Sequence, residues 1–252
     1  ALPPAKPDRL TVSHVSFTYP GASHAVIQDC TFSAAPSDII GITGGTASGK
    51  STLGRLFLME SPHEGSITWG QKELGRDISP LSLIGYMGHS MELFNASLKE
   101  NIGLGKKGNL DEALWGACLA EEAAAFPQGV KTVIGEGGIR LSGGQQARVM
   151  IARLLYHRRP LLILDDPFAS VDMKTEDQLF DRIHALCRDS IILLISHRLR
   201  TFPKTSQVLW IGKDGRVTTS THEKLLAENE DYRRLWALQN PEMHESHCEE
   251  RR

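Results

Sequence analysis

A glycine-rich loop between a short apolar stretch and a helical pattern constrains the fold of this chain more than any other feature. The apolar stretch is Ile39–Ile42, and helical spacing follows with Leu53, Leu56 and Phe57. The loop matches the pattern G-x-x-x-x-G-K-[ST], in which inward-pointing backbone N–H groups surround phosphate oxygens at the positive end of a helix. Its residues are Gly44, Gly45, Thr46, Ala47, Ser48, Gly49, Lys50, Ser51 and Thr52. This order of strand, loop and helix predicts a nucleoside triphosphate site.

Two carboxylates follow a second apolar stretch. Leu161–Leu164 is expected to be a buried strand, and Asp165 and Asp166 come directly after it. The carboxyl ends of parallel strands carry the ligands in α/β sheets. We therefore expect Asp165 and the Ser51 hydroxyl to hold Mg²⁺, with Lys50 adding a positive charge for the phosphates. The other interpretation is a solvated aspartate pair that caps a strand.

The composition fits a chain that can bury a full core. It has 252 residues, 40% of them hydrophobic, and a formal net charge of -2. That charge argues against nucleic acid held on a broad basic surface, so no nucleic-acid partner is expected. The four cysteines form no CxxC pair, which argues against a zinc site or a disulfide framework. No apolar run approaches the length of a membrane span, so we expect this segment to be soluble.

The pattern along the chain predicts an α/β fold with a P-loop NTPase core and a mainly parallel sheet. Alternating residues over Leu10–Val15 and Val26–Ser33 favour an N-terminal antiparallel β subdomain. Helical runs such as Leu110–Ala125 predict an inserted α-helical subdomain at about 95–157. Later segments alternate strand and helix, which indicates parallel strands covered on both faces. The expected limits are a linker at 1–9, the nucleotide-binding domain at 10–240, with its last helix over Glu223–Leu238, and a disordered tail at 241–252.

A third motif sits at the start of a strongly helical run. Leu141 and Ser142 precede Gly143, Gly144 and Gln145, and Ser142 is placed to cap the helix. Two glycines at this position expose backbone N–H groups to an anion. Ordinary helix capping explains the motif equally well on its own.

Together these motifs resemble the nucleotide-binding domain of ATP-binding cassette (ABC) proteins, and the resemblance runs from about Leu10 to Leu238. In that family two such domains face each other, and each ATP lies between the P-loop of one and the LSGGQ signature of the other. The resemblance therefore implies ATP and Mg²⁺ as cofactors and a second nucleotide-binding domain, in a homo- or heterodimer, as partner. It also implies that Ser142, Gly143, Gly144 and Gln145 contact the partner's ATP in trans.

Other positions follow the family's order. Tyr19 matches the aromatic residue that stacks on adenine, and Val26 is expected to line the same pocket, although either could be a core residue at a strand end. His197 matches the switch histidine that contacts the γ-phosphate. The segment 169–172, Ala-Ser-Val-Asp, matches the D-loop, whose Asp172 is expected at the dimer interface.

Two segments resemble the exporter branch of the family. They are 92–102 and 133–138, and the second occupies the position of the loop that senses the transmembrane domains. The resemblance implies the ATP-hydrolysing engine of an exporter, at the cytoplasmic face of a membrane, with the transmembrane domain elsewhere on the same polypeptide or on another one.

Three residues depart from the family's pattern. Asp166 replaces the glutamate that polarises the attacking water, and its reach is shorter by ~1.5 Å. His89 stands in place of the Q-loop glutamine, where it would contact Mg²⁺ and the lytic water. Ala47 replaces a glycine, and we expect it to tighten the loop slightly. Asp166, His89 and His197 are thus the candidate catalytic residues, and Ser51, Asp165 and His89 the candidate metal ligands.

These departures resemble the degenerate half of heterodimeric exporters, which keeps a good signature and has a weakly hydrolytic site of its own. Three alternatives stay open. Asp166 could be a tolerated variant in an active homodimer, or the chain could be a non-hydrolytic, nucleotide-dependent dimerisation or regulatory module. A soluble ABC protein of translation or repair is disfavoured, because the chain has a single P-loop, a single signature and no heptad run.

Overall fold

The computed structural model describes residues 6–89 and 92–240, and the expected disordered tail at 241–252 lies outside this range. A mainly parallel six-stranded sheet forms the centre, in the order β12-β11-β3-β10-β9-β6, and β12 alone runs antiparallel to its neighbour. Its strands are β3 (Ile39–Gly44), β6 (Ile84–Met87), β9 (Leu161–Asp165), β10 (Ile191–Ile195), β11 (Gln207–Ile211) and β12 (Val217–Ser220). This arrangement confirms the α/β fold class.

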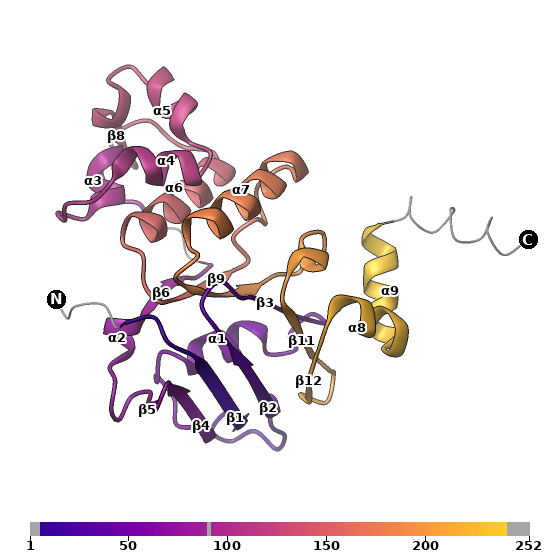
Figure 1. Ribbon diagram of the computed structural model, residues 1–252. Helices are drawn as coiled ribbons and strands as arrows, with labels where there is room; N and C mark the ends of the chain where they lie inside the picture. The colour runs from indigo at the N-terminus through magenta and orange to yellow at the C-terminus, as the bar shows by residue number, and fades with distance from the viewer. Residues whose placement is uncertain (1–5, 90–91, 241–252) are drawn as a thin grey trace, which may run out of the picture.

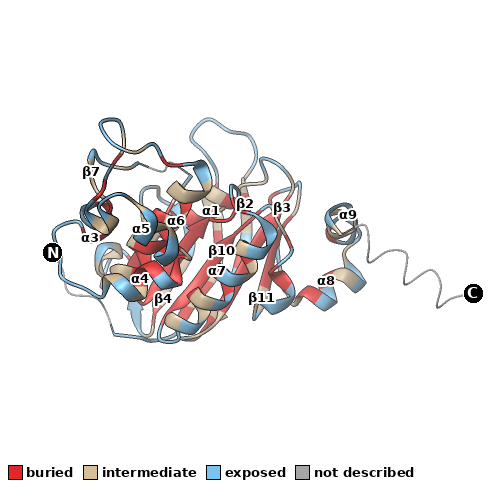
Figure 2. Cartoon of the chain, turned by 90° about the horizontal axis from the view of Figure 1, so that it is seen from above, coloured by how far each residue is buried: buried red, intermediate tan, exposed pale blue. Residues whose placement is uncertain are grey.

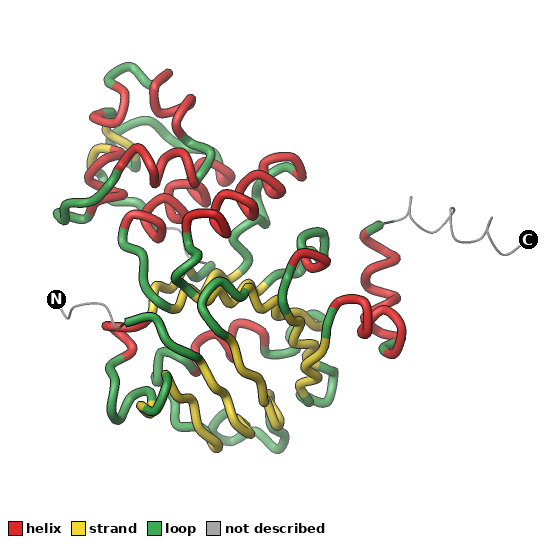
Figure 3. Tube along the Cα trace, in the orientation of Figure 1, coloured by secondary structure: helices red, strands yellow, loops and turns green. Residues whose placement is uncertain are grey.

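A four-stranded antiparallel sheet, in the order β2-β1-β4-β5, forms the N-terminal part (Figures 1 and 3). Its strands are β1 (Leu10–Phe17), β2 (Ile27–Ala34), β4 (Glu64–Trp69) and β5 (Lys72–Glu73). A short pair, β7 (Ala96–Ser97) and β8 (Val133–Ile134), lies among the helices. The helices are α1 (Lys50–Leu56), α2 (Pro80–Leu83), α3 (Leu98–Gly103), α4 (Leu110–Gly116), α5 (Ala120–Ala125), α6 (Gly143–Tyr156), α7 (Met173–Leu186), α8 (His222–Glu228) and α9 (Glu230–Gln239), with 3₁₀ turns at Gly129–Lys131 and Phe202–Lys204.

Both faces of the central sheet are buried, as the continuous apolar strands predict. Leu162 and Leu164 of β9 join a core shared with α4, α6 and α7, whereas Leu161 and Ile163 join a core shared with α1 and the antiparallel sheet. Figure 1 shows α6 and α7 on one side of this sheet and α1 on the other, and Figure 2 shows the buried strands between helices with exposed outer faces. The sheet therefore holds the loops at its carboxyl edge in fixed positions.

Two expected helices are each divided in the structure. The run Leu110–Ala125 forms α4 and α5, because Cys118 between them has a left-handed backbone with φ 53°. The run Glu223–Leu238 forms α8 and α9, and Asn229 caps α9 by accepting a hydrogen bond from the Tyr232 backbone. The composition predicted one continuous helix in each case. The backbone conformation at one residue, Cys118 or Asn229, instead divides each run into two helices.

A buried histidine in the α8–α9 pair makes stability depend on pH. His222 Nδ1 lies 2.7 Å from the Tyr232 hydroxyl, and the imidazole packs edge-on against the ring of Trp236. Burial lowers the pKa of His222, an effect that Glu223 partly opposes. The folded pKa is thus below the unfolded value of about 6.5, so the unfolded chain binds more protons in this range.

We expect the free energy of unfolding to fall as the pH drops from 7 through 6.5 towards the folded pKa of His222. In His222→Gln this part of the pH dependence should disappear, so the difference in the free energy of unfolding between pH 7 and pH 5 should be smaller than in the parent. Urea unfolding at both pH values measures it, and His24→Gln, at an exposed loop position, is the matched control. An unchanged pH slope in His222→Gln would contradict the assignment.

Candidate functional site

The P-loop follows β3 at the carboxyl edge of the central sheet and leads into α1. Gly49 has φ 95°, and a Cβ atom there would lie 3.1 Å from Val26 Cγ1, so both the backbone conformation and the close packing favour glycine. Ala47 has φ 59°. An alanine in the left-handed region costs roughly 1 kcal/mol. The slight tightening of the loop expected at Ala47 stays a prediction.

Lys50 is buried and its ammonium bonds to the loop itself. Nζ donates to the carbonyl oxygen of Gly44 at 3.1 Å and to that of Gly45 at 2.7 Å. Burial lowers the pKa of Lys50, and the negative charges of Asp166 and Asp165 oppose this shift. A buried cation held only by carbonyl dipoles and nearby carboxylates is suited to binding a stronger anion.

Polar atoms around the loop lack protein partners. Among the residues that the structure describes, Thr43 Oγ1, Ser48 Oγ and Asp166 Oδ1 are buried without a hydrogen bond, and each belongs to or borders the P-loop or the end of β9. Buried polar groups are normally satisfied, so such a cluster is typical of a site for a polar ligand. A nucleoside triphosphate supplies acceptor oxygens for hydroxyl donors, and the hydroxyls of Thr43 and Ser48 therefore fit it.

Asp165 and Ser51, the two oxygen ligands expected for Mg²⁺, lie in direct contact. The Ser51 hydroxyl donates to Asp165 Oδ1 at 3.1 Å, and Asp165 is buried. Hard oxygen donors of this kind fit Mg²⁺. His89 Nε2 lies 3.5 Å from the same carboxylate oxygen, with 58% of its side chain exposed. Among residues 6–89 and 92–240, no cluster of three or more histidine, cysteine, aspartate or glutamate residues is placed to hold a metal.

Tyr86 is a site residue that the sequence analysis missed. Its hydroxyl donates to Asp165 Oδ2 at 3.4 Å, and burial, reinforced by the charge of Asp165, raises its pKa. Tyr86 lies on β6 and pairs with Ile163 of β9. The order of strands in the sheet brings it to Asp165, and no local motif around residue 86 could have indicated this.

Asp166 and His197 lie at the ends of neighbouring strands, facing the loop. Asp166 has a left-handed backbone with φ 54°, and its N–H donates to the Ile195 carbonyl at 2.8 Å, which ties the ends of β9 and β10 together. Burial lowers the pKa of His197, the charge of Lys50 adds to the shift, and Asp166 opposes it. The charges of Lys50, Asp165 and Asp166 thus all act on this imidazole.

Tyr19 and Val26 lie on the side of the P-loop nearest the antiparallel sheet. The Tyr19 hydroxyl shares a 2.8 Å hydrogen bond with Thr52 Oγ1, and its ring packs edge-on against Phe17 while staying 46% exposed. Val26 packs against Gly49. The exposed ring face of Tyr19 is free to stack on a planar group.

The signature segment starts α6 away from these residues. Ser142 and Gln145 form a capping box, and Gln145 Nε2 donates to Glu122 Oε2 at 2.8 Å. Within the described ranges, no hydrogen bond joins the residues Ser142–Gln145 to the P-loop. Glu122, which also pairs with Arg148 at 2.6 Å, was missed because it lies 23 residues earlier, on α5.

The D-loop follows Asp166 and ends where α7 begins. Asp172 is exposed and caps α7, with its carboxylate accepting hydrogen bonds from the Thr175 backbone N–H at 3.0 Å and hydroxyl at 2.6 Å. These bonds lower the pKa of Asp172. A cap of this kind fixes the carboxylate at the surface.

Comparison with known proteins assigns the family. The family described as "ABC transporter" matches residues 27–169. The chain belongs to this ABC transporter family. An uncharacterised ABC transporter ATP-binding protein of Bacillus subtilis is 36% identical over 239 residues, which cover 92% of this chain and 41% of the relative. An ATP-dependent lipid A-core flippase of Pseudomonas syringae pv. tomato is 35% identical, over 91% of this chain and 40% of the relative.

A solved structure agrees with this family assignment. A bacterial Atm1-family ABC exporter with ATP bound superposes with a TM-score of 0.83 at 29% identity, over 94% of this chain and 43% of that one. The ABC domain thus spans about two fifths of the length of the relatives it matches. The predicted membership of the ABC family and the P-loop NTPase fold are confirmed, and as an ABC domain the chain binds ATP. Throughout the described ranges, the helices are all too short or too polar to cross a membrane.

Proposed function

We propose that this ABC domain is the ATP-hydrolysing engine of an exporter and that it dimerises head to tail around two Mg-ATP. The observation that carries the proposal is the convergence of Lys50, Ser51 and Asp165 beside buried hydroxyls that lack partners. Relatives support the transport role, since one is named a probable multidrug resistance ABC transporter ATP-binding/permease protein. The partners would be a second ABC domain and the transmembrane domain of the exporter, with this domain at the cytoplasmic face of the membrane.

Each residue of the site has a role in this proposal. Lys50 and the loop N–H groups bind the phosphates, and the Tyr19 ring stacks on adenine beside Val26. Ser51 and Asp165 hold Mg²⁺, which neutralises phosphate charge when bound. Asp166 orients and deprotonates the attacking water, and the neutral imidazole of His197 faces the γ-phosphate.

The domain's own site is proposed to hydrolyse slowly. Asp166 is one methylene shorter than the glutamate of the family, and a misplacement of about 1 Å costs ~10²-fold in rate. At position 89 the family carries a flexible glutamine, and the rigid imidazole of His89 reaches Mg²⁺ and the attacking water with a different geometry. The signature Ser142–Gln145 would then complete a more active site on the partner, with Asp172 at the interface. The proposed limits stay 1–9 for a linker, 10–240 for the domain and 95–157 for its helical subdomain.

Mixing two disabled variants tests the head-to-tail arrangement. Lys50→Ala removes the phosphate lysine but keeps the signature. Gly143→Asp keeps the P-loop and places a carboxylate where the partner's phosphates would lie, and the fold should accept it because a Cβ there meets Ser170 at an ordinary 3.5 Å. Each variant alone should show background phosphate release, whereas the equimolar mixture should recover about a quarter of the parent rate, since half the dimers carry one intact site of two.

If ATP turnover by the parent is too slow to measure, the Asp166→Glu substitution is added to the parent and to the Lys50→Ala and Gly143→Asp variants. Failure of the mixture to exceed its components would overturn the head-to-tail proposal for a homodimer. Tight ATP binding together with turnover at background, with or without Asp166→Glu, would favour the alternative, a non-hydrolytic dimerisation or regulatory module.

A further inference from the structure

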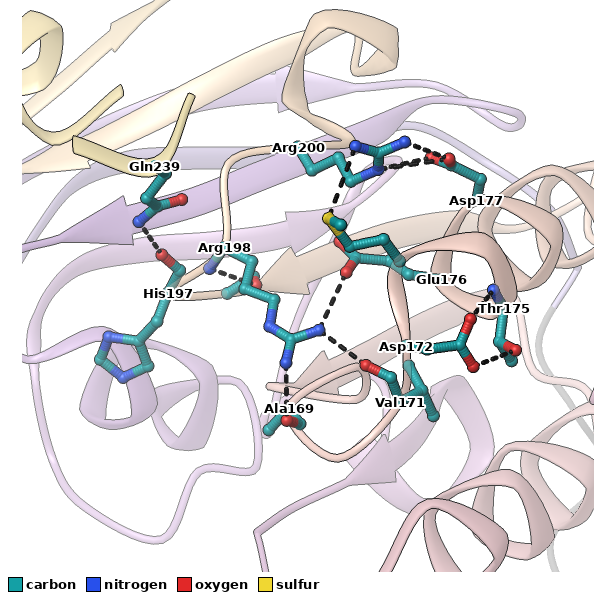
Figure 4. A network of polar contacts seen from close by, with 12 residues as sticks. Ala169, Val171, Asp172, Thr175, Glu176, Asp177, His197, Arg198, Arg200 and Gln239 are labelled. Carbon is teal, nitrogen blue, oxygen red and sulfur yellow. Dashed lines mark hydrogen bonds and ion pairs between the residues drawn. The ribbon is translucent and has the colours of Figure 1, made fainter. Parts of the chain in front are cut away.

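The switch loop, defined here as residues 196–200 after β10, is held on one side by the last residue of α9. Gln239 Nε2 donates to the His197 carbonyl at 2.7 Å, and Gln239 Oε1 accepts from the Leu199 N–H at 2.9 Å (Figure 4). One amide group therefore fixes the main chain before and after Arg198. The Arg198 N–H is itself bonded to the buried Ser196 hydroxyl at 2.9 Å.

The side chain of Arg198 leaves the switch loop towards the D-loop. Nη2 donates to the Ala169 carbonyl at 2.9 Å, and Nη1 donates to the Val171 carbonyl at 2.8 Å. Figure 4 shows the guanidinium between these two carbonyls. The fork geometry of arginine suits two acceptors on separate residues, and a single ammonium group cannot reproduce it.

A buried carboxylate holds the guanidinium in this position. Glu176 of α7 has no exposed surface, and its Oε2 lies 3.2 Å from Arg198 Nη1 while its Oε1 has no hydrogen-bond partner among the described residues. Burial raises the pKa of Glu176, and Arg198 opposes the shift. Separating this pair would leave a buried carboxylate without its counter-charge, so movement of Arg198 away from α7 is unfavourable.

The D-loop in turn packs on the start of α6. A Cβ atom on Gly144 would lie 2.6 Å from the Ser170 carbonyl oxygen, so glycine alone permits this approach. Ser170 lies between the two residues whose carbonyls Arg198 binds. A displacement of the switch loop would thus be transmitted through Arg198 and Ser170 to the signature.

We infer that Arg198 is a positioning residue that couples His197 of this domain's ATP site to the D-loop and, through Ser170, to the signature that serves the partner's site. This coupling rests on the proposed function, because only in a head-to-tail dimer would a change at the ATP of this domain alter the geometry of the partner's ATP site. Its structural part concerns contacts within one chain and is testable without nucleotide.

Arg198→Lys tests the coupling, and Arg200→Lys is the matched control. Arg200 lies in the same loop and pairs with Asp177 at 2.7 Å, and its Nη1 also contacts Met173 Sδ at 3.8 Å. In the part of the chain that the structure describes, it bonds to no carbonyl of the D-loop. Amide hydrogen exchange over 166–176 and the imidazole NMR signal of His197, identified by its loss in His197→Ala, are measured on the nucleotide-free chain. In Arg198→Lys we expect exchange of the D-loop amides to rise about tenfold and the His197 signal to move. Neither should change in Arg200→Lys.

A second measurement separates positioning from general destabilisation. Exchange in the core strands β9 and β10 should stay within about twofold of the parent in Arg198→Lys. When the parent and the Arg198→Lys variant both carry Asp166→Glu, Arg198→Lys should lower kcat about tenfold and leave KM for ATP unchanged. A uniform rise in exchange across the chain, or an unchanged D-loop and His197 signal, would overturn the inference. If the parent chain itself did not bind ATP, only the proposed function would be overturned, because the hydrogen-exchange and NMR results do not depend on nucleotide.

Discussion

Lys50→Ala should weaken ATP binding about a hundredfold while leaving the chain folded. In the structure the ammonium bonds to two P-loop carbonyls at 2.7 and 3.1 Å, and within residues 6–89 and 92–240 it makes no hydrogen bond to a side chain. Charge-assisted hydrogen bonds contribute about 1.5–3 kcal/mol each, and two lost bonds to phosphate at the lower end of this range, about 3 kcal/mol together, account for the expected hundredfold change. Calorimetric titration of Mg-ATP into parent and variant measures the effect.

Lys204→Ala is the matched control for this experiment. Lys204 pairs with Asp181 at 2.8 Å near the start of β3, whereas Lys50 follows the end of that strand. The control removes one lysine charge at the opposite edge of the sheet and should leave the affinity for ATP within about twofold of the parent. Equal affinities of parent and Lys50→Ala would refute the assigned phosphate site.

The motifs that carry the site could be predicted because each is local. The P-loop needs neighbouring residues to form a strand, a turn with a glycine at positive φ, and a helix start. The apolar stretch Ile39–Ile42 indicates the strand, and the order Gly49, Lys50, Ser51 indicates the turn and the helix start. Asp165 followed from its place after an apolar strand. The Ser142 cap on α6 likewise depends on residues three positions apart.

The contacts between distant segments could not be predicted in the same way. Tyr86 reaches Asp165 through the pairing of β6 with β9, and Arg198 reaches Ala169 across the turn that follows β9. Both depend on which strands are neighbours, and that order is set by packing of the whole sheet. The left-handed backbones of Ala47 and Asp166 were also missed, since alanine rarely adopts this conformation and aspartate, although it tolerates it, more often does not.

Asp166→Glu should raise the rate of ATP hydrolysis by this domain about 10- to 100-fold. The aspartate N–H is bonded to the Ile195 carbonyl, and its Oδ1 is buried without a partner, so the backbone fixes where the carboxylate starts and the side chain alone sets its reach. One added methylene extends the reach by ~1.5 Å, and a general base needs hydrogen-bond contact with the attacking water. Phosphate release at saturating Mg-ATP measures the change.

The left-handed backbone at Asp166 limits this gain without cancelling it. Aspartate tolerates φ 54° better than glutamate does, so the variant should lose some stability, by less than about 1 kcal/mol. Asp166→Asn is the control for charge: it keeps the size of the side chain and should remove the residual hydrolysis, while ATP affinity stays near that of the parent in both variants. If the glutamate variant turned over no faster than the parent, the short reach of Asp166 would not be limiting, and the aspartate would be a tolerated variant in an active homodimer. A faster glutamate variant would assign the slow step to the chemistry at this carboxylate and would make the intact signature the part that this chain supplies to its partner.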